Sequence, residues 1–559
     1  MSKLPLYLKL FNAVYKFITD KQGDIPVFHG NDIPDFIQAS KHDDIVRNRA
    51  ISYQSKKYQD DFLRDLMSDD KISMSSFGLL IDGKLVKEYY CSPYSPKFRH
   101  VAYSVSKTIV ALAVGLAVDE GKLCLTDKVF DYFPSHSNIF PKKGMKQITV
   151  EHLLTMTAGV NFNELESYFS YDWCRDFFSS TMKFSPGTGF YYNSMNSYIL
   201  MALLTKVLDE NPMEYLNRKL FFPMGITDIT WDKCPKGIEK GGWGVKLSLI
   251  DSLKLGQLIL NKGVWSVGKR ITPLISEEWI NKILELHVPC NGKNLKGYGY
   301  GIWLLKDGAY LYNGMFGQNI YINPTYNMVI AIFSSAGEVF PDGPLVDRII
   351  SFVNGNYIPK KNTSIQKNKI IEYYASKNTK KYLSPYFGNV YRFQHYAGSI
   401  LPLSSQLIYS NFLSGIDKLS ISMKDERLLL KVKDSGETFV INIGYKTGYK
   451  YQLIKINGKY MPIASLGKVY CDDKGRRFLK IHIVFLEEIG NKILKLYFDE
   501  DEIRLSSDET PDLTGFLEKL LGEDKIKVSN RLKEIQTKDY FMYKLNKIIS
   551  PRAKGYLDD

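Results

Sequence analysis

Ser104 and Lys107 are the residues of this chain whose types and spacing most directly indicate covalent chemistry. A serine hydroxyl is a poor nucleophile at neutral pH and needs a base within hydrogen-bond reach. Residues three apart share one face of a helix, so this spacing brings the hydroxyl and the amine together. The apolar residues of the stretch SVSKTIVALAVGLAVDEG, 104–121, run almost all round the predicted helix. The pattern predicts a Ser-x-x-Lys dyad at the start of a buried central helix.

The dyad alone is a weak signal, because serine and lysine are common residues. A second copy, Ser266 and Lys269, lies in NKGVWSVGKR, where two glycines indicate a turn, and we interpret it as a chance match. Ser104 has an alternative role as a helix cap, and Lys107 has one as an exposed lysine of the first turn. The surrounding segments must therefore decide between catalysis and structure.

The segments around the dyad predict one α+β domain over residues 70–355. Two strand-like runs, SFGLLID and KLVKEYYC, meet at Asp82-Gly83, a dipeptide suited to a tight hairpin turn. AYLYNG, QNIYINP and NMVIAIFSS predict three later strands, and PLVDRIISFV predicts a closing helix. Helical stretches lie between them, including ITVEHLL and the segment after the Gly-rich GGWG. Strands at both ends of a helical stretch predict that the first and last elements share one sheet.

Three further regions flank this domain. Residues 1–69 form an N-terminal extension, in which KHDDIVRNRAISYQSKKYQDDFLRDLM predicts an exposed helix. Residues 356–383 are rich in lysine and predict a linker. Residues 384–559 contain six short alternating runs separated by turn residues, which predict a smaller, mostly antiparallel β-rich domain with helices near 512–521 and 538–548. No motif in this last region indicates its role.

Composition excludes several classes of function. Hydrophobic residues make up 44% of the 559 residues and aromatic residues 13%, which is enough for buried cores. The net charge of +14 comes from lysines and arginines spread among acidic residues along the chain, so we expect no nucleic-acid partner. The six cysteines lie far apart, and no two of them form a Cys-x-x-Cys pair. They predict neither a metal site nor a disulfide framework, and we expect no cofactor.

The N-terminal stretch MSKLPLYLKLFNAVYKF is interrupted by Lys9 and is not followed by a small-residue cleavage site. It therefore predicts an amphipathic helix rather than a signal peptide. No run approaches the roughly 18 apolar residues that a membrane span needs. Together with the isolated thiols, these features predict a cytoplasmic protein without a membrane span.

The order of several segments strongly resembles the serine β-lactamase-related hydrolases. The most similar branch includes class C β-lactamases, D,D-peptidases of that type, and many esterases and amide hydrolases. The resemblance covers about residues 70–355 and implies a metal-free serine hydrolase with an antiparallel sheet, flanking helices and a helical lobe. It is carried by SFGLLIDGKLVKEYY, HVAYSVSKTIVALAVGLAVDEGKLCLTDKVFDYFP, ITVEHLLTMTAGV, PGTGFYYNSMNSYIL, GGWGVKLSLIDSLKLGQLIL and NGMFGQNIYINP.

The resemblance assigns roles to the dyad and to a second motif. Ser104 matches the acylated nucleophile, and Lys107 matches its partner amine. Tyr192 matches the tyrosine of the Tyr-x-Asn motif, which here reads Tyr-Asn-Ser, and Ser194 takes the substrate-binding position. Lowering the pKa of a tyrosine from about 10 to about 7 takes roughly 4 kcal/mol. One cation at contact distance supplies about that much at an effective dielectric of 20, so Lys107 alone could activate Tyr192.

The third motif, Lys-Thr-Gly or His-x-Gly in relatives, falls at Tyr312, Asn313 and Gly314. Gly314 permits close approach of a substrate to the strand backbone. The resemblance implies that the backbone N–H groups of Ser104 and Met315 receive the oxyanion. Relatives hold a substrate carboxylate with a cation at the first position of this motif, whereas Tyr312 offers a phenol. Tyr312 is equally well explained as a wall of the pocket or as a catalytic group.

Other candidates have better explanations outside catalysis. A literal Lys-Thr-Gly at residues 446–448 lies in the C-terminal domain, in a predicted hairpin turn, and we discount it. His100 and His152 lie in family-like segments, and we expect both to be structural. Tyr191 competes with Tyr192 for the catalytic role, and either tyrosine has an alternative role in aromatic packing.

These features predict a serine hydrolase that cleaves a small carboxylic ester or amide through an acyl-enzyme on Ser104, with Lys107 and Tyr192 as the proton-transfer pair. We expect a neutral substrate, because Tyr312 lacks the charge of the family's lysine. One alternative is β-lactam hydrolysis or penicillin binding, although a cytoplasmic location disfavours a cell-wall substrate. Another is a catalytically silent member that binds a ligand or partner. The sequence leaves the oligomeric state open.

Overall fold

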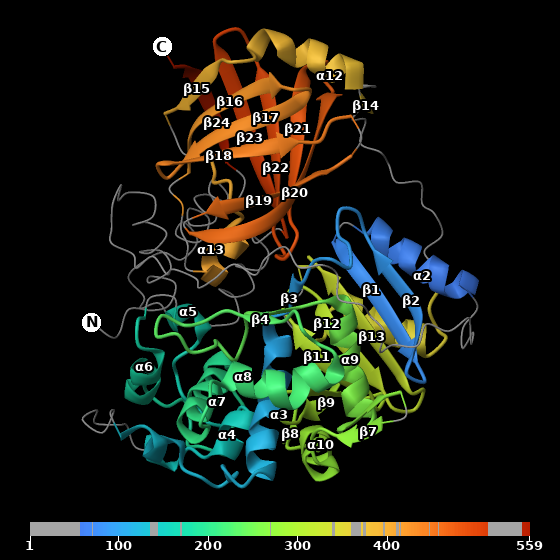
Figure 1. The fold of residues 1–559 in the computed structure, drawn as a ribbon, viewed down its shortest axis with the longest axis vertical. Coiled ribbons are helices and arrows are strands. Elements are labelled where there is room, and N and C mark those ends of the chain that lie inside the picture. The colour runs from blue at the N-terminus through green and yellow to red at the C-terminus, as the bar shows by residue number, and fades with distance from the viewer. Residues whose placement is uncertain are drawn as a thin grey trace, which may run out of the picture. The chain divides into compact units, whose positions relative to one another are not determined.

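The computed structural model shows two compact units (Figure 1). The first unit is described from residue 56 to residue 358, and the second from residue 371 to residue 558. The candidate site lies in the first unit. The residues that the structure describes are 56–69, 71–134, 144–167, 170–268, 270–337, 341–358, 371–372, 376–394, 397–409, 413, 415–446, 448–456, 458–511 and 551–558.

An eight-stranded antiparallel sheet forms the centre of the first unit, in the order β2, β1, β13, β12, β11, β10, β9, β8. The turn between β1 and β2 has positive φ at Asp82 (50°) and Gly83 (71°), as the dipeptide predicted. β1 pairs with β13, with Phe77 opposite Ile332, which confirms that the first and last strands share one sheet. The strands are β1 (Met74–Ile81), β2 (Lys84–Tyr90), β8 (Val288–Pro289), β9 (Leu295–Tyr298), β10 (Trp303–Leu305), β11 (Tyr310–Gly314), β12 (Gln318–Asn323) and β13 (Met328–Ser334).

Helices cover both faces of this sheet (Figure 1). Successive residues of β11 enter different cores, because side chains alternate along a strand. Tyr312 joins the core shared with α3 and α9, and Leu311 joins the core shared with α2 and α11. The covering helices are α2 (Lys56–Ser68), α3 (Ser106–Asp119), α9 (Leu249–Leu260) and α11 (Pro344–Val353).

The prediction of an exposed helix before residue 69 is wrong for its described part, α2. Phe62, Leu63 and Leu66 of this helix are at most 4% exposed. Phe62 stacks on Phe352 of α11 with ring centroids 4.3 Å apart. Residues 62 and 66 are four apart and therefore lie on one face, so α2 is an amphipathic helix whose apolar face completes the core.

A lobe of helices packs on the other side of α3, which lies between this lobe and the sheet (Figure 1). Every residue of α3 from Ser106 to Ala117 is buried, which confirms the predicted central helix. Gly115 allows a close approach, because a Cβ there would lie 2.0 Å from Nε1 of Trp279 in α10. The helices of the lobe and α10 are α4 (Val150–Leu154), α5 (Glu164–Ser167), α6 (Trp173–Ser179), α7 (Ser194–Val207), α8 (Pro212–Leu216) and α10 (Glu277–Leu284).

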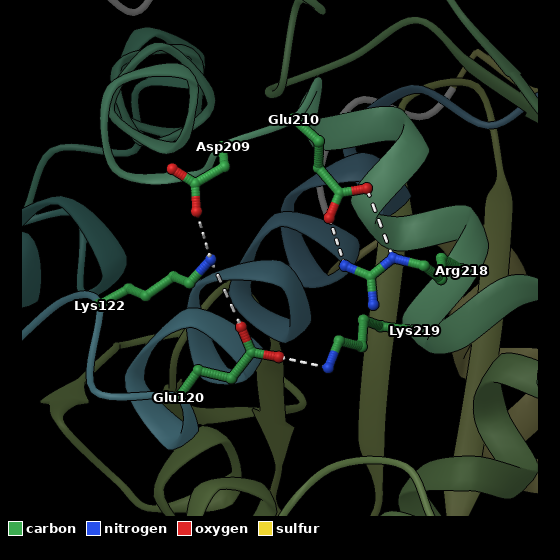
Figure 2. Close-up of polar contacts among 6 residues, drawn as sticks. All are labelled: Glu120, Lys122, Asp209, Glu210, Arg218 and Lys219. Atoms are coloured by element: carbon green, nitrogen blue, oxygen red, sulfur yellow. Dashed lines mark hydrogen bonds and ion pairs between the residues drawn. The ribbon is translucent and has the colours of Figure 1, made fainter.

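Charged side chains link the C-terminal end of α3 to the segments that follow α7 (Figure 2). Glu120 directly follows α3 and pairs with Lys219 of η5 (Asn217–Phe221) at 2.5 Å. Lys122 lies 3.8 Å from Glu120 and 3.5 Å from Asp209. Partly exposed pairs of this kind stabilise a fold only slightly. They lie at the end of α3 opposite to the Ser-x-x-Lys dyad.

Two small sheets complete the first unit. One brings the segment before the dyad against a later loop, since β3 pairs with β5 and places Val101 opposite Lys246. The other is a hairpin of β6 and β7. Their strands are β3 (His100–Val101), β4 (Thr230–Trp231), β5 (Val245–Leu247), β6 (Val264–Val267) and β7 (Arg270–Pro273).

The second unit is a near-barrel of antiparallel strands around an apolar interior. Gly444 follows β18 and joins it to β20, because its N–H donates to Ser465 O (3.1 Å) and its carbonyl accepts from Gly467 N (2.7 Å). The sheet thereby turns back on itself. Its elements are β14 (Ile371–Glu372), α12 (Ser376–Leu383), β15 (Val390–Phe393), α13 (Leu403–Tyr409), β16 (Ile416–Lys424), β17 (Arg427–Asp434), β18 (Glu437–Ile443), β19 (Lys450–Ile456), β20 (Lys459–Cys471), β21 (Arg477–Phe485), β22 (Asn491–Phe498), β23 (Glu502–Thr510) and β24 (Arg552–Leu557).

The six predicted strands of this unit are confirmed as β16, β17, β18, β19, β21 and β22. The predicted helices near 1–17, 512–521 and 538–548 lie outside the described residues. The exact domain boundaries remain a prediction, although α12 occupies the end of the range expected to be a linker. Within the described ranges, no helix is long and apolar enough to cross a membrane.

Candidate active site

Ser104 lies in a turn of 3-10 helix, η1 (Tyr103–Val105), that leads directly into α3. The segment is anchored on both sides of the serine. Ala102 N donates to Val245 O (2.9 Å), and Ser106 Oγ donates to Tyr103 O (2.6 Å). Ser104 itself is partly exposed, so its hydroxyl is held at the edge of the core rather than inside it.

Lys107 lies in the first turn of α3 and is 2% exposed. Its Nζ donates to three oxygens, which are Ser104 Oγ (2.7 Å), Ser194 Oγ (3.0 Å) and the Gly242 carbonyl (2.8 Å). An ammonium has three N–H donors, so these acceptors match its full donor set. Unpaired burial of such a group would be costly. The structure brings the Ser104 hydroxyl and the Lys107 amine into contact as their spacing predicted.

Two segments remote from α3 in sequence supply the other acceptors. Ser194 is the first residue of α7, and Gly242 lies in the loop between β4 and β5. A Cβ on Gly242 would lie 2.4 Å from Ser194 O and 2.6 Å from Ser194 Cβ. The loop approaches α7 this closely only because residue 242 has no side chain.

Asn193 fixes the start of α7 and is 1% exposed. Its Oδ1 accepts from Met195 N (2.9 Å), the bond of a helix N-cap. Its Nδ2 donates to the carbonyls of Val160 (3.1 Å) and Phe162 (2.9 Å). The middle residue of the second motif is therefore structural, and it positions the two residues on either side of it.

Tyr192 presents its ring to Lys107, whose Nζ lies 4.7 Å from the ring centroid in cation–π geometry. Trp303 of β10 stacks on Tyr192 with centroids 5.4 Å apart and an interplanar angle of 27°. Tyr298 meets it edge-on at 6.0 Å. Tyr191 instead lies under the ammonium of Lys183, 3.6 Å from its ring centroid. Of the two adjacent tyrosines that compete for the catalytic role, Tyr192 is therefore the one in contact with Lys107.

The end of β11 lies against the segment that precedes Ser104. A Cβ on Gly314 would lie 2.2 Å from Ala102 O, so glycine is required for this approach. Met315 begins the turn to β12, and its carbonyl accepts from Gln318 Nε2 at 3.3 Å. The third-motif strand and the segment that precedes Ser104 are therefore in direct contact.

Tyr312 and Asn313 are built into the sheet. Tyr312 is 0% exposed, and none of the described groups bonds to its hydroxyl. Burial raises the pKa of Tyr312 well above its ordinary value, so the phenol stays neutral. Asn313 donates from Nδ2 to Oδ1 of Asn319, opposite it on β12, at 2.7 Å. Substrate binding by either side chain remains a prediction.

Sequence reasoning missed two groups at this site, the Gly242 carbonyl and the Trp303 ring. The double glycine of GGWG was the available signal for the first, since adjacent glycines mark a close approach of backbone. Trp303 had no signal, because only the folded sheet brings β10 beside the second motif.

The chance motifs lie where their turn residues predicted. Ser266 belongs to the β6–β7 hairpin, whose turn has φ 60° at Gly268. Lys446 lies between β18 and β19 in the second unit and pairs with Glu426 at 2.7 Å. Neither serves as a second dyad or third motif in the first unit.

Two histidines in family-like segments make structural contacts. His100 stacks on Phe333 with centroids 4.9 Å apart. His152 shares a capping box with Thr149 at the start of α4, and burial lowers the pKa of His152. Across the described part of the chain, no three His, Cys, Asp or Glu side chains gather closely enough to hold a metal ion.

Comparisons with known proteins show the family of this chain. The chain matches the model of the Beta-lactamase family over residues 60–353, more than half of its length. It is 23% identical to the 6-aminohexanoate-dimer hydrolase of Paenarthrobacter ureafaciens over 297 residues, which are 46% of this chain and 72% of that protein.

Two solved structures show distant likeness. An octameric penicillin-binding protein homologue from Pyrococcus abyssi is 17% identical, with a TM-score of 0.44 and coverage of 80% of this chain and 99% of that one. A family VIII carboxylesterase is 17% identical, with a TM-score of 0.43 and coverage of 54% and 97%. From the family match, the chain is a hydrolase that belongs to the Beta-lactamase family.

Proposed function

We propose that this protein hydrolyses a carboxylic ester or amide through an acyl-enzyme on Ser104. The observation that carries the proposal is the position of Lys107 Nζ, 2.7 Å from Ser104 Oγ and bonded to two further oxygens. In its neutral form the amine can donate its two N–H groups to Ser194 and Gly242 and turn its lone pair to the Ser104 hydroxyl, which gives serine the base that nucleophilic catalysis requires. The second and third acceptors, Ser194 and Gly242, fix the direction of the amine.

Lys107 and Tyr192 form the proton-transfer pair. Ser104 Oγ attacks the carbonyl carbon while its proton passes to this pair, and a tetrahedral oxyanion forms. The backbone N–H groups of Ser104 and Met315 hold that oxyanion, by analogy with the family. The leaving alcohol or amine takes the proton as its bond to carbon breaks, and water then hydrolyses the serine ester to a carboxylic acid.

The substrate is a small neutral molecule. The third-motif position carries Tyr312, a buried and neutral phenol, where relatives place a cation for a substrate carboxylate. This favours esters and amides over β-lactams. The relative from Paenarthrobacter ureafaciens is named as a hydrolase of the 6-aminohexanoate dimer, which supports amides as one class to test.

The test is turnover of a panel of p-nitrophenyl esters, anilides and linear amides by the parent protein and by Ser104→Ala. The matched control is Ser266→Ala, which removes the serine of the chance Ser-x-x-Lys copy on an exposed hairpin. We expect hydrolysis by the parent and by Ser266→Ala, and none above background by Ser104→Ala. Equal activity of the two variants would exclude Ser104 as the nucleophile, and turnover of nitrocefin alone would favour a β-lactamase.

A further inference from the structure

Two aromatic residues with left-handed backbone conformation flank the amide groups assigned to the oxyanion. Tyr103 has φ 48° and directly precedes Ser104, and Phe316 has φ 65° and directly follows Met315. Bulky L-residues adopt positive φ only where the surrounding structure imposes it. Each amide donor therefore has a strained aromatic neighbour.

The rings of these two residues contact each other. Their centroids are 5.4 Å apart with an interplanar angle of 64°, the favourable edge-to-face arrangement. Tyr103 is 2% exposed and Phe316 is 3% exposed, so the contact is dry. The close approach of Gly314 to Ala102 brings the two backbone segments together beside it. A shift of either ring must therefore shift a peptide group that borders Ser104 or Met315.

The backbone of Phe316 is held by three hydrogen bonds. Its carbonyl accepts from Gln318 Nε2 (3.0 Å), Ser334 Oγ (2.9 Å) and Ala336 N (3.0 Å). Gln318 is fully buried and also donates to the Met315 carbonyl at 3.3 Å. These bonds fix the turn. The ring of Phe316 therefore packs against Tyr103 from a fixed position and holds the segment that carries Ser104 in place.

We propose that Phe316 is a positioning residue of the oxyanion hole, acting through its ring contact with Tyr103. The proposal rests on the proposed function above, because it concerns the same acyl transfer. Donors act on a tetrahedral intermediate only when they are aimed at the place where its charge develops. The ring pair keeps the N–H groups of Ser104 and Met315 aimed at one point while the covalent bond forms.

Phe316→Gly separates the ring from the backbone conformation. Glycine adopts φ 65° without steric cost, so this variant keeps the turn accessible and removes only the ring. Phe316→Leu retains bulk and serves as a second variant if the glycine variant does not fold. We expect kcat to fall about 10- to 100-fold in both, with KM within about threefold, because misaligned donors weaken the transition state more than the bound substrate.

The matched control is Phe62→Leu in α2. Phe62 is 0% exposed and makes an edge-to-face contact with Phe77, with centroids 6.0 Å apart at 68°. It belongs to the core on the α2 side of the sheet, so we expect lower thermal stability and an unchanged kcat. The double variant Phe316→Leu/Tyr103→Leu tests whether Phe316 acts through its ring contact with Tyr103. Two variants that break the same contact give kcat losses that do not add.

The outcomes separate this inference from the proposed function. Fluorophosphonate labelling of Ser104 in the parent, together with wild-type kcat for folded Phe316→Gly or Phe316→Leu, would overturn the inference alone. Additive losses for the Phe316 and Tyr103 variants would also overturn it. A folded parent that is never labelled at Ser104 would overturn the proposed function and this inference with it.

Discussion

Replacement of Gly242 by alanine tests how Lys107 is held without removing a catalytic group. The added methyl group would lie 2.4 Å from Ser194 O and 2.6 Å from Ser194 Cβ. Real Cβ atoms essentially never approach other atoms to within 3.0 Å, so the loop and α7 must move apart. These two segments carry two of the three acceptors of Lys107 Nζ, which lie at 2.8 Å and 3.0 Å.

The size of the effect follows from this geometry. Restoring ordinary contact requires a displacement of roughly 1 Å, and a displacement of that size at a catalytic group lowers the rate about 100-fold. Overpacking destabilises a fold by about 1–3 kcal/mol, so we expect Gly242→Ala to remain folded at 25 °C with a lower melting temperature. Residue 242 does not have a positive φ, so the loss would come from contact rather than from backbone strain.

The assay compares kcat for an activated ester with the melting temperature of each variant. Gly337→Ala is the matched control, because an added Cβ there meets no atom of the described residues within 4 Å and residue 337 does not have a positive φ. We expect Gly337→Ala to resemble the parent in both measurements. Full activity of Gly242→Ala would refute the role of this approach in holding Lys107, and so would an equal loss in Gly337→Ala.

Two further predictions concern the second unit. Lys492→Met removes the ammonium that lies 3.4 Å from the carboxylate of Glu509, where the two side chains are 3% and 2% exposed. The loss of this buried countercharge should lower the free energy of unfolding in urea by about 3 kcal/mol. Lys446→Met breaks a pair in the same unit whose side chains are 46% and 58% exposed, so it should cost about 0.5 kcal/mol or less, and equal losses would contradict this account. Burial, aided by the charge of Lys480, lowers the pKa of His482 from its ordinary value near 6.5 to about 4. The unfolded chain then binds the proton first as the pH falls, so the parent should lose stability between pH 6.5 and pH 4, and His482→Gln should lose less of it. The two proteins should show the same pH dependence above pH 7, and parallel melting curves down to pH 4 would contradict the assignment.

Local patterns were sufficient to predict most of the fold. The apolar spacing after Ser104 predicted α3, and the turn dipeptide at Asp82 predicted the first hairpin, because both signals depend on residues close in sequence. β20 escaped prediction because Pro462 and Gly467 interrupt its alternation, although both lie inside the paired strand. α2 was mistaken for an exposed helix because its many charged residues masked the apolar face.

The site was predictable only where its parts are local or follow from the family resemblance. Ser104 and Lys107 are three residues apart, so helix geometry alone brings them together. The Gly242 carbonyl lies 135 residues from Lys107 in the chain, and its bond to Nζ depends on how the loop packs against α7. Trp303 reaches Tyr192 only through the strand order of the sheet. Neither contact follows from spacing in the sequence.

Intact-mass spectrometry after incubation with a fluorophosphonate tests the central claim most directly, because this reagent bonds only to an activated nucleophile. The parent, Ser104→Ala and Ser266→Ala are compared as folded proteins. We expect one adduct in the parent and in Ser266→Ala, and no adduct in Ser104→Ala. A folded parent without an adduct, or an adduct that persists in Ser104→Ala, would contradict the assignment of Ser104 as the nucleophile.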